Sequence, residues 1–323
     1  MTSGGGALTA EQLSVEYRGA GWRSRVLAVR NATLRVNAGE VVGLVGESGS
    51  GKSSVARALV GLAPVTAGVM QLDDTVLGPS APRSQRRLVQ MVFQNPRASL
   101  NPRRTVRQAL TEALAASPAR AGGHGTETAE HLLAAVSLPV GLLDRLPHQM
   151  SGGQCQRVAI ARALAAQPHY LLADEVTAAL DATVAAGVVS VLRRLANERR
   201  VGVLLITHDL RTVEWIADSV AVMYLGEIVE QGPAADVLNR PLHPYTAALL
   251  AARPSLHHRR TEPLPLVGDL GTRAAAGCQF APRCPFARGD CHTVAPIPTR
   301  PLAATHVVAC HHPLVPRDGA PAR

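Results

Sequence analysis

The sequence contains almost no lysine. Of its 33 Lys and Arg residues, 32 are arginine and one, Lys52, is lysine. Aromatic residues are also scarce, at 3%, so we expect an aliphatic core. No apolar run approaches the roughly 20 residues that a membrane-spanning helix needs, and the N-terminus lacks the basic and apolar segments of a secretory signal. We therefore expect a soluble protein, or one that is attached to a membrane only through partners.

The positive charge of the chain is dispersed. The formal net charge at pH 7 is +9, which by itself suggests a nucleic-acid-binding protein. A nucleic-acid-binding face should show clustered basic residues interleaved with aromatic ones. Here the arginines occur in pairs at most: Arg86-Arg87, Arg103-Arg104, Arg193-Arg194, Arg199-Arg200 and Arg259-Arg260. We therefore expect no nucleic-acid partner and interpret the arginines as solvated surface, with a basic surface facing anionic lipid as the alternative.

The single lysine lies in a phosphate-binding motif. The segment Gly46-Glu47-Ser48-Gly49-Ser50-Gly51-Lys52-Ser53 has the spacing G-x-x-x-x-G-K-[ST], between an apolar strand predicted over residues 40–45 and a helix that starts near Ser53. Its glycines let backbone N–H groups point at a phosphate, and the helix adds its positive N-terminal end. We expect these residues and Ser54 to bind ATP, with the compact ammonium of Lys52 at the β- and γ-phosphates and the Ser53 hydroxyl on Mg²⁺. The alternative is a Gly/Ser-rich turn with an incidental lysine.

The order of the predicted elements indicates an α/β fold. Residues 7–95 read as short strands followed by the phosphate loop and its helix, and residues 97–168 are helical in pattern. From Tyr170 onward strands and helices alternate, which is typical of a mostly parallel sheet with helices on its faces. After about residue 254 the sequence is rich in Pro, Arg, His and Cys, so we expect a separate, small C-terminal region.

Polar side chains follow three of the predicted strands. Asp174 and Glu175 end one apolar strand, Gln94 ends a second and His208 follows a third. Ligands bind at the carboxyl ends of parallel strands, so we expect one site, with Asp174 holding Mg²⁺ through water and Glu175 polarising a water for attack on the γ-phosphate. Gln94 would reach both the Mg²⁺ and that water. The alternatives are ordinary polar strand ends and a structural histidine.

A second helix start also has the features of a phosphate site. In Ser151-Gly152-Gly153-Gln154 the serine is a predicted N-cap, and two glycines expose backbone N–H groups at the start of a helix that runs to Ala165. An ordinary capped helix is the alternative. A second phosphate site remote from Lys52 suggests a dimer that closes around the nucleotide.

In this combination the motifs resemble the ATPase subunits of ABC transporters. Their Walker A, Q-loop, signature, Walker B, D-loop and H-loop motifs correspond in order to residues 46–53, 94, 151–154, 174–175, 180–181 and 208. The resemblance implies a RecA-like parallel core, an N-terminal antiparallel β subdomain and an inserted helical subdomain at about residues 97–168. It also implies that Glu175, His208 and Gln94 are catalytic and that Tyr17 stacks on adenine, with Trp22 as the rival aromatic.

Further segments narrow the resemblance. Residues 93–103, 241–250 and 277–285 are similar to the ATPases of the peptide/nickel permease family, and the first of them to its F-type subunit. We therefore expect an ABC ATPase domain at residues 7–253 and a family-specific Cys-rich region at residues 254–323. Val176 and Ala178 depart from the family pattern without removing a catalytic group. The hydroxyl missing at Ala178 is expected to weaken communication between the two ATP sites of a dimer.

Four of the five cysteines lie in the C-terminal region, with the spacing C-x5-C-x6-C-x18-C: Cys278, Cys284, Cys291 and Cys310. A reducing compartment disfavours disulfides, whereas four thiolates suit zinc or an iron–sulfur cluster. Some members of the resembled family carry a [4Fe-4S] cluster at this motif. We therefore expect a cluster, with zinc or unliganded thiols as alternatives. Nearby histidines are either zinc ligands or surface residues: His292, His306, His311 and His312.

The resemblance predicts an ATP-hydrolysing subunit that energises peptide import at the cytoplasmic face of a bacterial membrane. The expected partners are a second ABC ATPase subunit in a homo- or heterodimer, two integral membrane permease subunits and an extracytoplasmic substrate-binding protein. An importer of nickel or another small solute is the nearest alternative. A soluble ABC ATPase acting on nucleic acid or ribosomes is more distant, because those proteins usually carry two ATPase halves or a long coiled coil. Glu175 and His208 argue against a non-hydrolysing subunit.

Overall fold

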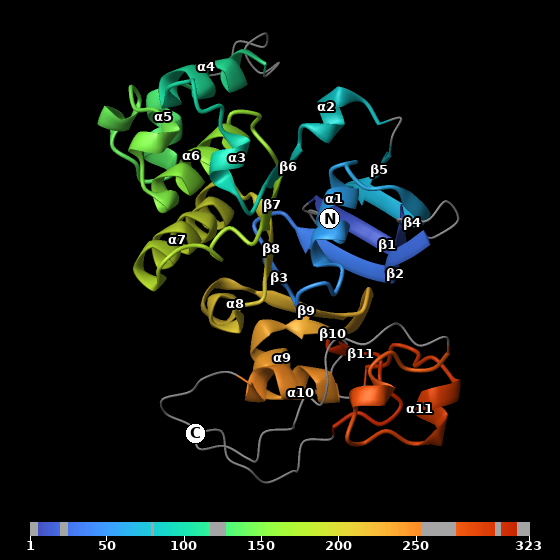
Figure 1. Cartoon of the computed structure of the whole chain (residues 1–323). Coiled ribbons are helices and arrows are strands. Elements are labelled where there is room, and N and C mark those ends of the chain that lie inside the picture. Colours follow the sequence, from blue (N-terminus) through green and yellow to red (C-terminus); the bar gives the residue numbers. More distant parts are fainter. Residues whose placement is uncertain are drawn as a thin grey trace, which may run out of the picture.

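An antiparallel sheet forms the N-terminal part of the fold. The computed structural model describes residues 6–19, 25–78, 81–116, 127–252, 276–300 and 305–314. Within these ranges the sheet has the strand order β2-β1-β4-β5. Its strands are β1 (Ala7–Arg18), β2 (Arg25–Asn37), β4 (Val65–Leu72) and β5 (Thr75–Leu77). Figure 1 shows this sheet on one side of the molecule, beside the first helix.

A second sheet forms the centre of the protein, with the order β11-β10-β9-β3-β8-β7-β6 in the described residues. Strands β9, β3, β8, β7 and β6 pair in parallel, whereas β10 and β11 are antiparallel additions at one edge. The bounds are β3 (Val41–Val45), β6 (Val89–Val92), β7 (Tyr170–Asp174), β8 (Gly202–Thr207), β9 (Ser219–Tyr224), β10 (Glu227–Pro233) and β11 (Val307–Val308).

Helices cover both faces of this sheet. They are α1 (Lys52–Leu59), α2 (Arg83–Arg86), α3 (Pro96–Ser99), α4 (Val106–Ala115), α5 (Ala129–Ala135), α6 (Gly152–Leu164), α7 (Ala182–Arg199), α8 (Leu210–Ile216), α9 (Ala234–Asn239), α10 (Pro244–Ala251) and α11 (Gly289–Thr293), with 3₁₀ turns η2 (Val140–Leu142), η3 (Pro147–Gln149) and η4 (Ala281–Arg283). Side-chain caps start the longer helices, for example Thr105 at α4 and Asp181 at α7. In Figure 1, α3 to α6 form a helical group on the side opposite the N-terminal sheet.

The alternation of side chains along the central strands explains why separate apolar clusters form on the two faces of the sheet. In β7, Leu171 and Ala173 belong to a cluster with α4 to α7, whereas Tyr170 and Leu172 belong to a cluster with α1 and the antiparallel sheet. Successive strand residues point to opposite faces, and here both faces are buried, as is typical of parallel strands. The predicted α/β architecture, with its parallel core, antiparallel subdomain and helical subdomain, is therefore confirmed.

The C-terminal region is more closely joined to the core than its composition suggests. Strand β11 pairs with β10, and the backbone N–H groups of Ala309 and Leu314 donate to the carbonyls of Val229 and Leu242, both at 2.8 Å. A division at residues 253/254 remains a prediction, because residues 253–275 lie outside the described part. No described helix is long and apolar enough to cross a membrane.

Candidate ATP-binding site

The phosphate loop connects β3 to α1, as its motif predicts. Gly46 has φ +153°, and a Cβ atom there would overlap the Met223 carbonyl and crowd Ser50 Oγ. Only glycine therefore fits this turn. Ser48 and Gly49 are exposed at the tip of the loop, whereas Ser50 is buried. The loop thus presents its backbone to solvent at the end of a buried strand.

Lys52 is folded onto the loop in this structure. Its Nζ donates to the carbonyl oxygens of Gly46 (2.9 Å) and Glu47 (2.8 Å) and to Ser50 Oγ (3.2 Å), and the residue is 4% exposed. Burial lowers the pKa of Lys52, and the carboxylates of Glu175 and two other acids offset part of that shift. The ammonium is therefore held inside the loop, where the carboxylates of Glu175 and Asp174 influence its pKa.

Two of the three predicted Mg²⁺ ligands, Ser53 and Asp174, meet directly. The Ser53 hydroxyl, in the first turn of α1, donates to Asp174 Oδ1 at 2.8 Å. Asp174 ends β7 and is 5% exposed. Burial raises the pKa of Asp174, and the hydrogen bond from Ser53 counteracts this shift. A buried carboxylate beside a hydroxyl provides two oxygen ligands of the kind that Mg²⁺ prefers.

Glu175 connects the other two predicted catalytic residues. Gln94 Nε2 donates to Glu175 Oε2 at 2.8 Å, and His208 Nδ1 lies 3.5 Å from Glu175 Oε1. Glu175 adopts the left-handed conformation, with φ +48°, and its N–H donates to the Ile206 carbonyl of the neighbouring strand. The side chains predicted from three separate strand ends therefore lie together, at the same sheet edge as the phosphate loop.

The other residues predicted to bind the nucleotide are Tyr17 or its rival Trp22, Gly51 and Ser54. Tyr17 lies in β1, packs against the second apolar cluster, and has a buried hydroxyl without a hydrogen-bond partner among the described residues. Its stacking on adenine remains a prediction. Trp22 lies outside the described residues. Gly51 has φ +105° and precedes α1, and Ser54 lies within the first turn of that helix.

The signature segment caps α6 rather than joining the phosphate loop. Ser151 is exposed, and its hydroxyl accepts the N–H of Gln154, whose side chain accepts the N–H of Ser151. Gly153 also has a packing role, because a Cβ there would overlap Val184 Cγ1 of α7. The same residues therefore form an ordinary capped helix and also leave its N-terminus exposed.

Two residues that contact the phosphate loop were missed by the sequence analysis. The Glu47 N–H donates to the Tyr245 hydroxyl at 3.0 Å, and Arg283 Nη1 donates to both Glu47 carboxylate oxygens at 3.2 Å. Both residues belong to segments that resemble the permease ATPases, residues 241–250 and 277–285. That resemblance was the only signal for them, because no sequence pattern indicated which residues fold against the loop.

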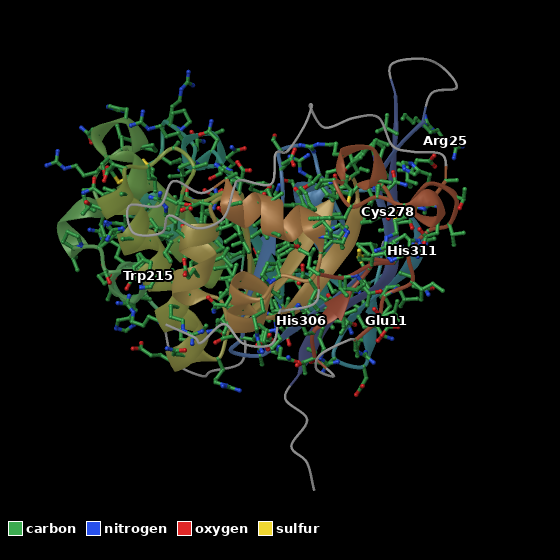
Figure 2. All side chains as sticks on the ribbon, turned by 90° about the horizontal axis from the view of Figure 1, so that it is seen from below. Glu11, Arg25, Trp215, Cys278, His306 and His311 are labelled. Carbon is green, nitrogen blue, oxygen red and sulfur yellow. The ribbon has the colours of Figure 1, made fainter. Side chains whose placement is uncertain are left out.

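The four C-terminal cysteines line one cavity, together with His243, Phe280, His311 and His312. Figure 2 shows Cys278 and His311 in the same part of the C-terminal region, with Trp215 on the far side of the molecule. Burial raises the pKa of Cys278 and Cys284, and raises that of Cys310 to about 11. These thiols are therefore protonated at neutral pH unless a metal displaces the proton. Cys155, the fifth cysteine, is fully buried in the apolar cluster that includes α4 to α7, where it has a packing role.

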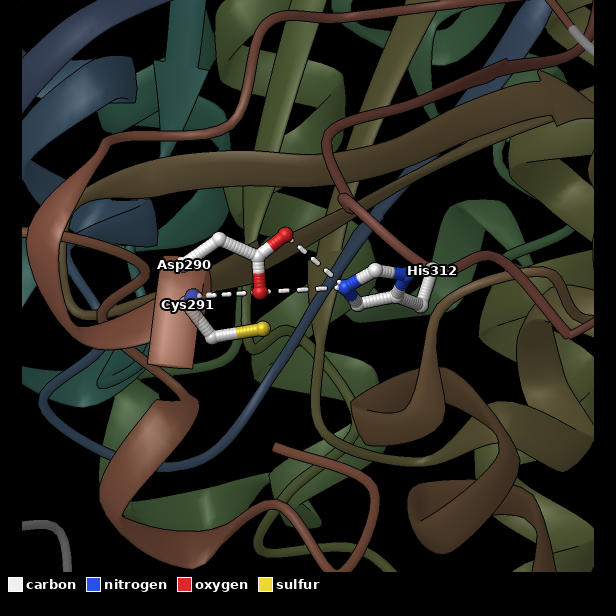
Figure 3. Close-up of side chains that lie close together, drawn as sticks. All are labelled: Asp290, Cys291 and His312. Atoms are coloured by element: carbon white, nitrogen blue, oxygen red, sulfur yellow. Dashed lines mark hydrogen bonds and ion pairs between the residues drawn. The ribbon is translucent and has the colours of Figure 1, made fainter. Parts of the chain in front are cut away.

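One group at this cavity, made of two of its lining residues and the exposed Asp290, offers metal ligands at close range. The ligand atoms of Asp290, Cys291 and His312 lie within 4.8 Å of one another. In Figure 3, His312 Nε2 faces both Asp290 carboxylate oxygens, at 3.1 and 2.9 Å. Of the four histidines named as candidate zinc ligands, His306 does not belong to this group. Its Nε2 is instead paired with the buried Glu230 carboxylate at 2.8 Å.

His243 brings an unsatisfied donor to the same cavity. The Tyr245 N–H donates to His243 Nδ1 at 3.0 Å, so the ring proton of the neutral imidazole lies on Nε2. His243 is 1% exposed, and its Nε2 has no hydrogen-bond partner in the described structure. Burial lowers the pKa of His243 to about 4. The ring is therefore neutral and presents an N–H without a partner.

Comparison with known families agrees with this site. The sequence matches the family described as "ABC transporter" over residues 29–178 and the family described as "Oligopeptide/dipeptide transporter, C-terminal region" over residues 229–291. It is 41% identical to a putative peptide import ATP-binding protein of Brucella abortus, over 91% of this chain and 89% of that protein. It is 40% identical to the di/tripeptide transport ATP-binding protein DppF of Pseudomonas aeruginosa, over 90% of this chain and 91% of that protein.

Solved structures show the same fold. A dimeric structure of the ATP-binding cassette MJ0796, in a post-hydrolysis state bound to ADP and Pi, matches with a TM-score of 0.59 at 27% identity, over 70% of this chain and 98% of that chain. The fold is also similar to that of cbiO1 from Clostridium perfringens, with a TM-score of 0.60 at 24% identity, over 72% of this chain and 90% of that chain. The chain is thus an ATPase that belongs to the ABC-transporter family, within the group that carries the oligopeptide/dipeptide transporter C-terminal region.

Proposed function

We propose that this chain is the ATP-hydrolysing subunit of a peptide importer and works at the cytoplasmic face of a bacterial membrane. The observation that carries the proposal is the meeting of Lys52, the Ser53–Asp174 pair and the Glu175 carboxylate at one sheet edge. The relatives named for peptide import, which match over about nine-tenths of the chain, support the choice of peptide as cargo.

The side chains at this edge account for hydrolysis of the γ-phosphate. Lys52 would exchange its loop acceptors for phosphate oxygens when ATP binds. Ser53 and Asp174 would hold Mg²⁺, which when bound offsets the negative charge of the phosphates. Glu175 would accept a proton from the attacking water, with Gln94 and His208 orienting its two carboxylate oxygens. The amide oxygen of Gln94 remains available for the Mg²⁺ or the water.

The exposed signature segment supports a dimer. An N–H-bearing helix start such as that at Ser151 is a ready anion site, and the MJ0796 cassette is described as dimeric. We propose that Ser151, Gly152, Gly153 and Gln154 of one subunit complete the ATP site around Lys52 of a second ABC ATPase subunit, which is either another copy or a homologue. One ATP would then be bound by two chains.

A groove beside Gln94 supports a contact with membrane subunits. It is lined by residues of β6 and the helical subdomain, including Met91, Phe93, Ala113, Ala116 and Arg162. Phe93 is 37% exposed although it is aromatic. We propose that the segment from Gln94 to Pro102 and this groove contact two permease subunits, so that movement at Gln94 is transmitted to them.

Cargo class is tested by reconstitution of the full chain with its second ATPase subunit, the two permease subunits and the substrate-binding protein in vesicles. We expect peptide-loaded binding protein to stimulate phosphate release. Stimulation by Ni²⁺ without peptide would replace the proposal with the nickel alternative. Phosphate release that is absent under all conditions would overturn the assignment of an importer ATPase.

We propose further that the four C-terminal cysteines hold a [4Fe-4S] cluster. A single tetrahedral zinc, with Zn–S bonds of about 2.3 Å, would bring the four sulfurs close together. Among the described residues, however, no three of these thiols lie within 4.8 Å of one another. The cluster proposal rests instead on the four thiols that line one cavity and on the resemblance of residues 277–285 to the permease ATPases. The partnerless Nε2–H of His243 also suits a sulfur-rich group, which accepts hydrogen bonds and, when bound, supplies a structural anchor for this segment.

The cluster is tested by anaerobic purification. The protein should be brown, with about four irons and four sulfides per chain. Cys284→Ser should bleach it, whereas the matched change Cys155→Ser should not. Stoichiometric zinc without iron would overturn the cluster and point instead to the group of Asp290, Cys291 and His312.

A further inference from the structure

The phosphate loop is held from outside by a residue of the C-terminal region. Arg283 lies between Cys278 and Cys284 in the sequence, yet its guanidinium donates to both carboxylate oxygens of Glu47 at 3.2 Å. The Arg283 side chain is 8% exposed and that of Glu47 is 22% exposed. Because both ends of this ion pair are largely shielded from water, dissolved salt screens it less than it screens a surface pair.

A cluster of aromatic rings determines where Arg283 lies. Its guanidinium carbon is 5.8 Å from the centre of the Tyr224 ring, and its Nη1 is 3.4 Å from the Tyr224 hydroxyl. The Tyr224 ring contacts those of Tyr245 and Phe280, with centroid distances of 4.6 and 5.3 Å. Phe280 follows Cys278 by two residues. Tyr224 is the last residue of β9. The cysteine-bearing segment therefore packs, through these rings, against the end of β9.

The same cluster fixes the backbone of the loop. The buried Tyr245 hydroxyl accepts the Glu47 N–H at 3.0 Å. The next peptide group is held on its other side, because the Glu47 carbonyl accepts from Lys52 Nζ at 2.8 Å. The conformation of the loop at Glu47 thus depends on Tyr245 and Arg283, which lie 198 and 236 residues away in the sequence.

The charge of Glu47 makes this contact important for nucleotide binding. The phosphates of ATP carry several negative charges, and a carboxylate in the loop that surrounds them opposes their binding. Arg283 neutralises this carboxylate and holds it on the side of the loop that faces the C-terminal region. Without Arg283, the Glu47 carboxylate would keep its negative charge but would no longer be held on that side of the loop.

We propose that Arg283 is a positioning residue for the phosphate loop, and that through it the C-terminal region sets the affinity for ATP. The inference rests on the proposed ATPase function but concerns binding rather than chemistry. Since Arg283 acts on the loop and not on Glu175, its loss should weaken ATP binding more than it slows turnover at saturation.

The test compares Arg283→Met with the full wild-type chain. Titration calorimetry with ATP should show affinity reduced about 3- to 10-fold, a fraction of what a hydrogen bond to a charged group contributes. Phosphate release should show KM raised similarly and kcat changed less than about twofold. Arg283→Lys, which keeps the charge, should lie between the two. The matched control Arg288→Met removes an exposed arginine of the same segment and should leave both constants unchanged.

A second pair of variants tests whether Arg283 affects ATP affinity through Glu47. In a Glu47→Gln background, the additional change Arg283→Met should have little further effect on ATP affinity, because no carboxylate remains to be held. An equal effect in both backgrounds, or wild-type affinity in Arg283→Met, would overturn the inference. Should Arg283→Met fail to fold, Arg283→Gln removes the charge but keeps a polar side chain, and unchanged ATP affinity in that variant would also overturn it. Calorimetry needs no hydrolysis, so an inactive wild-type protein would count against the proposed function and not against this contact.

Discussion

Replacing Glu175 by glutamine should separate ATP binding from hydrolysis. The carboxylate accepts from Gln94 Nε2 at 2.8 Å, and a glutamine oxygen can accept the same hydrogen bond with almost no change of shape. The phosphate loop and the Ser53–Asp174 pair do not depend on Glu175 for their contacts with each other. We therefore expect unchanged folding and ATP affinity. Removal of the general base should lower turnover by about 10²- to 10⁴-fold, which corresponds to about 3–5 kcal/mol in the activation barrier.

The assay is phosphate release at saturating MgATP, together with ATP binding by calorimetry and the oligomeric state in the presence of ATP. Glu175→Gln should remain dimeric with ATP, because the step that reopens the dimer is blocked. Glu112→Gln, at an exposed position of α4, is the matched control and should turn over normally. Turnover of Glu175→Gln within about tenfold of wild type would refute the role of Glu175 as the base.

Three further changes test the structure. Lys52→Arg should bind ATP nearly as weakly as Lys52→Ala. The Lys52 ammonium has three acceptors within 3.2 Å in an almost fully buried position, which a wide guanidinium cannot occupy. Tight ATP binding by Lys52→Arg in calorimetry would contradict this. Gly153→Ala should lower the free energy of unfolding by about 1–3 kcal/mol, because the new Cβ would overlap Val184. Adding Val184→Ala to that variant should restore the stability. Equal stability of Gly153→Ala and wild type in denaturant unfolding would exclude the clash. The pKa of His243 is about 4 in the fold and ordinarily 6.5, so the unfolded chain binds more protons between these values. Stability should therefore fall by up to about 3 kcal/mol as pH drops from 6.5 to 4, and His243→Asn, which keeps an acceptor for the Tyr245 N–H, should flatten that slope.

The predictable part of this protein consists of local patterns. The spacing around Lys52 requires a turn that only glycines can make, and its strand and helix neighbours follow from hydrophobic runs and caps within a few residues. The same holds for α6, whose cap at Ser151 was predicted from the sequence. Because parallel strands end at one sheet edge, the convergence of Gln94, Glu175 and His208 also followed from sequence order.

The C-terminal region shows what local patterns do not contain. Its low periodicity predicted a separate region, yet β11 completes an edge of the central sheet, and His306 is buried against Glu230. Pairing between Arg283 and Glu47 depends on how rings from three distant segments pack together, and nothing within a few residues of either partner specifies it.

By itself, the sequence determined that this protein is an ABC ATPase, because the residues predicted to bind phosphate and activate water lie in short motifs whose spacing dictates their geometry. Only the tertiary structure decided that the cysteine-bearing segment lies against the phosphate loop, that four thiols spread over residues 278–310 share one cavity, and that Gly153 is needed for helix packing. These features arise from contacts between residues far apart in the chain, and their free energy depends on the burial and close approach that only the folded protein provides.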